Sequence, residues 1–297
     1  MSKMLIFQLY GALAAWGESA VGEFRPSSTH PSRSSVLGLL AAALGLERAA
    51  EEEHAALSRS VGFGVLVIKS GLPLRDFHTA QVPPSRSGFL PRTRAQELQE
   101  EKLNAVLSTR EYRQDGLWLV VLWQTRVGDP TYSLERLKDA LEFPHFLPFL
   151  GRKSCVLGLP LAPELLQVES VREALEHRYA QLQRVERQLL EPRVTSSGRR
   201  HRGEGQMPLR PSDTAKGPHT PASLLLRDPL RAFPRVGLQP PPLLELPLYW
   251  EKPDSPEILL GVPECQSVER LDAVVQRRTF RFEPRLEFQG MWRIPHE

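Results

Sequence analysis

The fold is predicted most directly by residues 4–45, which read MLIFQLYGALAAWGESAVGEFRPSSTHPSRSSVLGLLAAALG. The run Met4–Tyr10 is almost entirely apolar and is followed by a glycine, a pattern typical of a strand buried on both faces. After a loop, apolar residues recur at helical spacing. Ser32 or Ser34 is expected to cap this helix, and Gly45 to end it. The stretch therefore predicts a strand, a loop and a helix.

Three further elements are predicted after this helix. Glu47–Ser60 is acidic and rich in alanine, which favours a second helix, and the β-branched run Val61–Gly71 predicts a second strand. Leu103–Arg113 and Leu117–Gln124 flank Asp115–Gly116, a dipeptide that favours a tight turn. These two segments are expected to form a β-hairpin.

A helix at Tyr132–Leu141 and a strand at Leu150–Cys155 complete the order strand, helix, strand, strand, helix, strand. This is the order of the ferredoxin-like fold, with which RNA-recognition modules present a sheet to unpaired bases. The fold class is therefore predicted to be α+β, with a ferredoxin-like core in residues 1–162. A stretch rich in proline and arginine, at about residues 80–103, predicts a protruding thumb-like insertion.

The second half of the chain divides into three predicted segments. Residues 163–191 have apolar side chains at spacings of three, four and seven, which predicts a long amphipathic helix. Residues 192–221 are dense in Gly, Pro, Ser and Arg and are expected to form a basic flexible linker. Residues 222–297 are expected to form a small β-rich C-terminal lobe.

The composition is that of a folded globular protein. Its 297 residues are 41% hydrophobic and 25% charged, with a formal net charge of +3 and an isoelectric point near 9.0. Cys155 and Cys265 lie far apart, without partners at metal-ligand spacing, so neither a zinc site nor a disulfide framework is predicted. The absence of a signal peptide and of an apolar stretch of about 18 residues predicts a soluble, cytoplasmic protein.

The first candidate site precedes the helix predicted after Ser32. Arg25, Arg33, Ser34 and Ser35 lie near a helix N-terminus, where free N–H groups and the helix dipole favour a phosphate. In the alternative interpretation the serines cap the helix and the arginines are solvated surface charges. Spacing alone favours this second interpretation.

Two more candidate sites follow. Arg110 and Tyr112, with His78 upstream, could hold a phosphate and stack a base, or could equally form a cross-strand ion pair beside a core tyrosine. Arg152 and Lys153 follow a glycine that would let the backbone approach a ligand closely. The alternative there is a turn before an edge strand protected by its charges.

The sequence contains no recognised catalytic motif and no clustered carboxylates for a metal, so no catalytic residue, metal or cofactor is predicted. Cleavage of RNA without a metal needs a base, an acid and a cation. His78, Tyr112 and Lys153 could fill these roles. A lone histidine beside an aromatic ring is nevertheless more often structural or RNA-contacting.

Several segments of the first half together resemble the CasD proteins, the fifth CRISPR-associated family, and most closely those of type I-E Cascade. They read LYGALAAWGESAVGEFRPSSTHPSRSSVLGLLAAALGL, DFHT, LSTREYRQDGLW and FLPFLGRKSCVLGLPL. The resemblance implies a ferredoxin-like core of the RAMP type, with a thumb, that binds the 5′ handle of crRNA. Carried onto this chain, it turns all of the candidates named above into expected RNA-binding residues: Arg25, Arg33, Ser34, Ser35, His78, Arg110, Tyr112, Arg152 and Lys153.

The resemblance implies a non-catalytic subunit of a type I Cascade complex in antiviral defence. The subunit would cap the backbone filament and help to seat the large subunit. Its expected partners are the crRNA handle, the neighbouring backbone subunit, the large subunit and, through the complex, target DNA. The alternative is a metal-independent endoribonuclease that processes pre-crRNA. The segments after residue 163 exceed what a compact type I-E member is expected to have.

Overall fold

The computed structural model describes residues 1–18, 20, 22–84, 93–99, 103–190, 243–254, 256–259, 261–262, 266–276 and 281–295. The chain divides into two compact units, one formed by Met1–Leu175 with Pro241–Glu297, and the other by Glu176–Pro240. The predicted linker, residues 192–221, lies outside the described residues. None of the helices described has the length and apolar character needed to cross a membrane.

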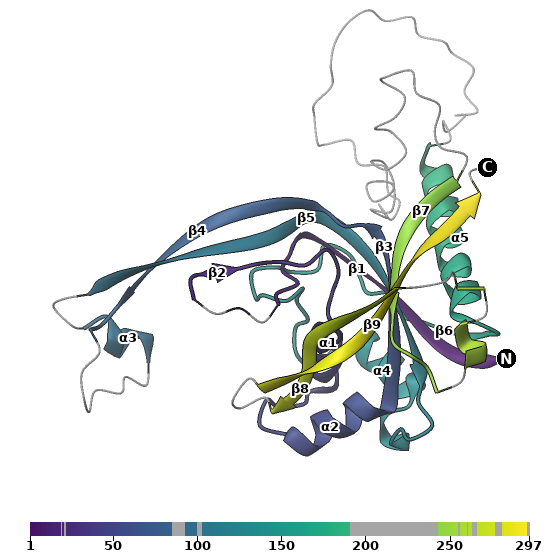
Figure 1. Ribbon diagram of the computed structural model, residues 1–297, viewed down its shortest axis with the longest axis horizontal. Helices are drawn as coiled ribbons and strands as arrows, with labels where there is room; N and C mark the ends of the chain where they lie inside the picture. Colours follow the sequence, from purple (N-terminus) through teal and green to yellow (C-terminus); the bar gives the residue numbers. More distant parts are fainter. Residues whose placement is uncertain are drawn as a thin grey trace, which may run out of the picture. The chain divides into compact units, whose positions relative to one another are not determined.

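The strands of the described residues form one large sheet. They are β1 (Ser2–Ala14), β2 (Phe24–Arg25), β3 (Val61–Lys69), β4 (Leu72–Val82), β5 (Asn104–Gln124), β6 (Glu164–Val168), β7 (Leu243–Trp250), β8 (Gln266–Gln276) and β9 (Arg281–Pro295). Their order is β6-β1-β5-β3-β7-β9-β8, and β2 and β4 also pair with β5. The pairings are antiparallel except the short one of β2 with β5. The protein is thus an α+β protein with a large, mainly antiparallel sheet (Figure 1).

The helices of the described residues are α1 (Arg33–Leu44), α2 (Glu51–Ser60), α3 (Arg94–Glu97), α4 (Leu134–Glu142) and α5 (Val171–Leu190), with 3-10 turns at Pro130–Tyr132 and Pro256–Leu259. The prediction for α1 is confirmed, with Ser32 as N-cap and a left-handed Gly45 as C-cap. The apolar sides of α1, α2 and α4 join buried residues of β1, β3 and β5 in one core. Figure 1 shows these three helices gathered beside the sheet.

The hairpin predicted at Asp115–Gly116 is wrong, because β5 runs through this dipeptide as one strand of 21 residues. Its first half pairs with β4 and its second half with β3, so β5 changes partner here. Asp115 has a φ of 57°, and its carboxylate accepts hydrogen bonds from Tyr10 and Lys69. A Cβ atom at position 116 would lie 2.1 Å from the ring of Trp118, so glycine is needed here for packing.

Instead, β4 and the first half of β5 form a two-stranded ribbon, along which Leu72 pairs with Gln114 and Val82 with Asn104. In Figure 1 the ribbon extends away from α1 and α4 toward the short helix α3. The described part of the insertion predicted at about 80–103 belongs to the end of this ribbon. The protruding element therefore begins about ten residues earlier on β4 than the composition indicates.

Two predictions between residues 150 and 191 also need correction. Residues 150–155 form a loop with one isolated bridge, between Phe149 and Val156, rather than a strand. The last strand of the predicted order is β6, which pairs with β1. The long helix begins at Val171 instead of residue 163, because Glu164–Val168 form β6.

The described C-terminal strands continue the sheet of the N-terminal region. Leu248, Tyr249 and Trp250 of β7 pair with β3, and β9 and β8 follow on the outer side. The sequence predicts a small β-rich C-terminal lobe at residues 222–297, and its described strands join the sheet of the N-terminal region through β7. Because β3 is buried, its backbone N–H and C=O groups need hydrogen-bond partners on both edges; β5 pairs along one edge and β7 pairs with Gly64–Leu66 on the other.

Candidate nucleic-acid interface

The base of the ribbon places charged side chains in a row across three strands. Asp76 of β4 lies opposite Arg110 of β5, and Arg25 of β2 lies opposite the same Arg110. Side chains opposite one another on neighbouring strands point to the same face of a sheet. Arg25 and Arg110 are therefore adjacent on one face. Within the described part of the chain, no hydrogen bond or ion pair engages the guanidinium of Arg110.

Arg152 stacks on an aromatic ring of this same face. The Tyr112 side chain, two residues along β5 from Arg110, is buried, and the guanidinium carbon of Arg152 lies 4.6 Å from its ring centroid. Nη1 of Arg152 donates a hydrogen bond of 3.2 Å to the carbonyl oxygen of Glu111. The ring and the carbonyl hold the guanidinium in one orientation.

His78 completes the face through contacts with two neighbours. Its Nε2 atom lies 2.7 Å from the carboxylate of Asp76 and 3.4 Å from the hydroxyl of Tyr112. Both neighbours approach the same nitrogen, so an Nε2–H group that donates to Asp76 cannot accept a proton from Tyr112.

Arg152 and Lys153 lie in a loop whose shape depends on Gly151. Gly151 has a φ of 87°, and a Cβ atom there would lie 1.9 Å from the carbonyl oxygen of Ala15. The close approach that the sequence suggests is therefore made to the protein's own backbone, not to a ligand. Lys153 is exposed beside Arg152.

The basic face is defined here as Arg25, His78, Arg110, Tyr112, Arg152 and Lys153. Its three arginines outnumber the carboxylate of Asp76, so the surface has a surplus of positive charge, and the exposed Lys153 follows Arg152 in the chain. Guanidinium groups bind phosphates, and a partly exposed imidazole offers a surface for an unpaired base. No group of three or more His, Cys, Asp or Glu side chains able to hold a metal ion occurs among the described residues.

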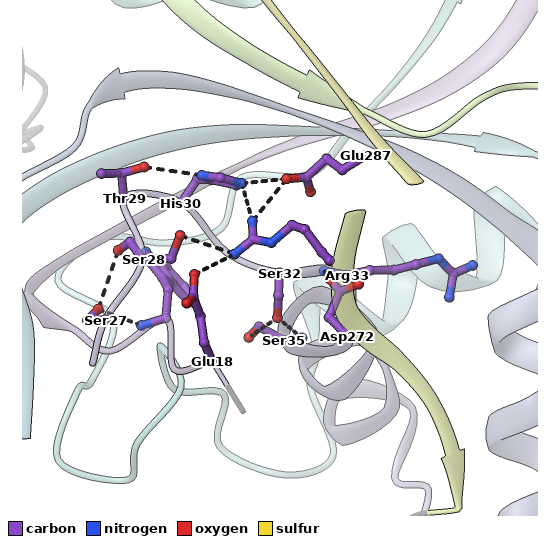
Figure 2. Close-up of polar contacts among 12 residues, drawn as sticks. Glu18, Ser27, Ser28, Thr29, His30, Ser32, Arg33, Ser35, Asp272 and Glu287 are labelled. Atoms are coloured by element: carbon purple, nitrogen blue, oxygen red, sulfur yellow. Dashed lines mark hydrogen bonds and ion pairs between the residues drawn. The ribbon is translucent and has the colours of Figure 1, made fainter. Parts of the chain in front are cut away.

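The three other predicted residues, Arg33, Ser34 and Ser35, lie at the start of α1, where their polar groups contact other groups of the protein. The backbone N–H of Arg33 donates to the carboxylate of Asp272 at 3.0 Å (Figure 2). The guanidinium of Arg33 forms an ion pair with Glu251 and donates to Ser58. A carboxylate from β8 thus takes the place predicted for a phosphate.

Ser34 and Ser35 are also engaged within the protein. Their hydroxyl oxygens lie 2.9 Å and 3.0 Å from that of Ser32. The Ser32 oxygen in turn accepts the backbone N–H of Ser35, as an N-cap does. For these serines the capping interpretation describes the structure better than the phosphate interpretation.

The start of α1 belongs to a buried charge network that the sequence did not predict. Nε2 of His30 lies 3.1 Å from the carboxylate of Glu287 (Figure 2). The same carboxylate pairs with Arg270 at 3.0 Å. The His30 ring stacks on Tyr249 with a centroid distance of 3.5 Å. The network is formed by His30, Arg33, Glu251, Arg270, Asp272, Arg285 and Glu287.

Arg285 is the central cation of this network. Its guanidinium donates two hydrogen bonds of 2.9 Å to Asp272, contacts Glu287 at 3.0 Å and lies 3.7 Å from Glu251. In the sequence, opposite charges stand two residues apart in each of the last two strands. They are Arg270 and Asp272 in β8, and Arg285 and Glu287 in β9. This spacing is the sequence signal of the network. On an exposed face such spacing is common, so burial of these charges could not be deduced from it.

We expect acidification to destabilise the protein through His30. Burial lowers the pKa of His30 below 6.5 against the opposing effect of Glu287, so below pH 6.5 the folded protein takes up a proton at this ring less readily than the unfolded chain does. The contribution of neutral His30 to the free energy of unfolding is complete above pH 6.5. Below this pH it falls by up to about 1.4 kcal/mol per pH unit. The substitution His30→Gln should therefore flatten the dependence of Tm on pH between pH 7 and 5.

The other groups around His30 do not change this comparison. Burial alone would raise the pKa of Glu287, but its hydrogen bond to His30 and the charges of Arg270 and Arg285 lower it to about 2. The stabilisation of the folded protein by ionised Glu287 is therefore lost only as the pH falls from about 4.5 to 2. Burial raises the pKa of Glu251, so this group favours the folded state as the pH falls. It does so in the wild type and in the His30→Gln variant alike. Parallel Tm curves for wild type and variant would contradict the role of His30.

The model of the CRISPR-associated Cas5 family matches residues 4–218. The CRISPR system Cascade subunit CasD of Escherichia coli (strain K12) is 34% identical over 183 residues, which are 59% of this chain and 76% of that protein. A chain of a solved CRISPR RNA-guided surveillance complex matches with a TM-score of 0.55 and 20% identity, covering 98% of this chain and 91% of that chain, which shows a shared fold. Because the family model spans more than half of the chain, this protein belongs to the Cas5 family of CRISPR-associated proteins.

Proposed function

We propose that the protein is a non-catalytic, RNA-binding subunit of a type I Cascade complex and that the basic face holds the 5′ handle of crRNA. The observation that carries the proposal is the alignment of Arg25 with Arg110 beside the stacked Arg152, on one face of the ribbon base. Arginine is well suited to this task because its planar guanidinium binds phosphate oxygens in pairs.

The arrangement of the first six elements of the core supports an RNA-binding fold. The strands β6, β1, β5 and β3 are neighbours in this order, and α1 and α4 pack together. We propose that this part is a ferredoxin-like core of the RAMP type and that the ribbon is its thumb. In this proposal the subunit caps the backbone filament and helps to seat the large subunit, so that the complex recognises target DNA through the guide.

Incubation of the purified protein with its cognate repeat RNA in EDTA tests the proposal. We expect binding without cleavage, read on a denaturing gel, and an affinity that falls steeply as salt is raised from 50 to 200 mM. A discrete cut at the boundary of the handle would instead identify a metal-independent processing nuclease. Affinity that does not depend on salt would contradict a phosphate-binding surface.

A further inference from the structure

A cavity of about 470 Å³ lies where the end of α2 and the start of β3 meet the last two strands, β8 and β9. Trp123 lines it from the end of β5, in the half of this strand that pairs with β3. Arg110 of the basic face belongs to the other half, which pairs with β4. The residues of the basic face do not line the cavity. The cavity is therefore a second place at which the protein could hold another molecule.

Trp123 brings to this cavity a hydrogen-bond donor that is not used within the protein. The residue is only 2% exposed, and no hydrogen bond engages its Nε1–H group within the described residues. Gly62, which also lines the cavity, leaves this group uncovered, because a Cβ atom at position 62 would lie 2.2 Å from Nε1. A largely buried donor without an acceptor is unfavourable. An oxygen atom of a molecule bound in the cavity would satisfy it.

Two cations of the cavity are also unused within the protein. Arg59, in the last turn of α2, and Lys252, just after β7, are exposed, and no hydrogen bond or ion pair engages either charged group in the part of the chain that the structure describes. Asp254 lines the same cavity, and its carboxylate accepts a backbone N–H at 2.8 Å. The other lining charges form ion pairs with one another and are Arg33, Glu251 and Arg285. The cavity therefore combines a surplus of positive charge with the free donor of Trp123.

These three donors favour an anion with several acceptor oxygens. The indole, the guanidinium and the ammonium group come from β5, from α2 and from the segment after β7, so three different parts of the chain supply them. A phosphate monoester has three terminal oxygens, whereas a carboxylate has two. Guanidinium and ammonium groups are both common partners of phosphate. The chemistry of the lining therefore favours a phosphate monoester.

The rest of the cavity has room for an organic group. Small-molecule pockets typically measure about 300–1,000 Å³, and the volume of this one, about 470 Å³, lies within that range. Its lining includes the apolar side chains of Val274 and Leu286. We infer that the cavity binds a phosphate monoester of the size of a nucleotide, with the phosphate on Arg59, Lys252 and the N–H group of Trp123. The inference does not rest on the proposed function, because the basic face is not part of this site.

Calorimetric titration of the full-length protein with AMP, adenosine and inorganic phosphate tests the inference. We expect AMP to bind about tenfold more tightly than adenosine or inorganic phosphate. Arg59→Gln combined with Lys252→Gln should weaken AMP binding about tenfold, and the variant should fold because both residues are exposed. Trp123→Phe keeps an aromatic ring but removes the N–H group, and should weaken AMP binding about three- to tenfold. Arg136→Gln combined with Arg293→Gln removes two exposed cations outside the cavity and should leave the affinity within about twofold of the wild type.

The phosphate monoester could come from a free nucleotide or from the 5′ end of a nucleic-acid strand, and two RNAs distinguish these sources. If AMP binds and 5′-phosphorylated repeat RNA binds more tightly than the same RNA with a 5′-hydroxyl, the cavity holds a strand end, provided that the Arg59 and Lys252 variant loses this difference. If AMP binds and the two RNAs bind equally, the cavity holds a free nucleotide.

Three outcomes would contradict the inference. Equal affinities for AMP and inorganic phosphate would overturn the assignment of an organic group. AMP binding that the Arg59 and Lys252 variant leaves unchanged would overturn the site. No binding of AMP, together with equal binding of the two RNAs, would overturn the inference as a whole, and the affinity for repeat RNA itself would still test the proposed function.

Discussion

Replacing Arg110 and Arg152 together with glutamate is expected to lower the affinity of the protein for its repeat RNA by about 100-fold. A hydrogen bond to a charged group contributes at least ~1.5 kcal/mol, so the loss of two such contacts amounts to ~3 kcal/mol. The slope of log K against log salt should also become shallower by about 1.4, because each phosphate contact on a single strand contributes about 0.7. Filter binding or fluorescence anisotropy across a salt series measures both quantities.

A matched control separates local contacts from net charge. Arg136→Glu with Arg293→Glu changes the net charge by the same amount, but these exposed residues lie on α4 and β9, away from the basic face. This control should lower the affinity only a few-fold and leave the slope nearly unchanged. If it weakens RNA binding as much as the Arg110 and Arg152 variant, the basic face is not a specific site.

Arg285→Ala is expected to lower the free energy of unfolding by about 3–5 kcal/mol, the largest stability effect that we predict. The substitution leaves three carboxylates, those of Glu251, Asp272 and Glu287, in a buried region without their shared cation. Glu251 keeps its ion pair with Arg33 and Glu287 keeps its ion pair with Arg270, but Asp272 loses the one cation that pairs with it among the described residues. Charges that lose a partner in a largely buried region are costly because the protein interior cannot replace their hydration. Denaturation with urea measures the change.

Arg293→Ala is the control for this experiment, because Arg293 lies on the same strand, β9. Its ion pair with Glu245 has the same 3.0 Å distance, but the two side chains are 66% and 47% exposed. An exposed pair contributes at most about 1 kcal/mol, so this variant should be almost as stable as the wild type. A similar small loss in Arg285→Ala would mean that the network adds little to stability.

The elements that were predicted correctly are those whose signals are local. The helix α1 carries its N-cap and its C-cap within 14 residues, Ser32 to Gly45, and β3 is a short run of β-branched and apolar residues. Asp115–Gly116 misled the prediction because the dipeptide has the composition of a turn. Only the pairing of β5 with two different strands explains why no turn forms there.

The same distinction applies to the candidate site. Residue type alone pointed to Arg110 and Arg152, but the proximity of Arg25 to Arg110 depends on the pairing of β2 with β5. The sequence predicts a helix N-terminus at Arg33, and α1 begins at this residue. The anion there is Asp272, which is 239 residues away in the sequence, and no local pattern could have indicated it.

The addition of β7 beside β3 has a consequence for biosynthesis. As the chain leaves the ribosome from its N-terminus, β3 and β5 can pair early, but the other edge of β3 stays open until β7 has been made. The contact of His30 with Glu287, 257 residues later, must wait still longer. An open strand edge is prone to intermolecular pairing. A nascent chain of this protein would therefore benefit from a holding chaperone until its last strands emerge.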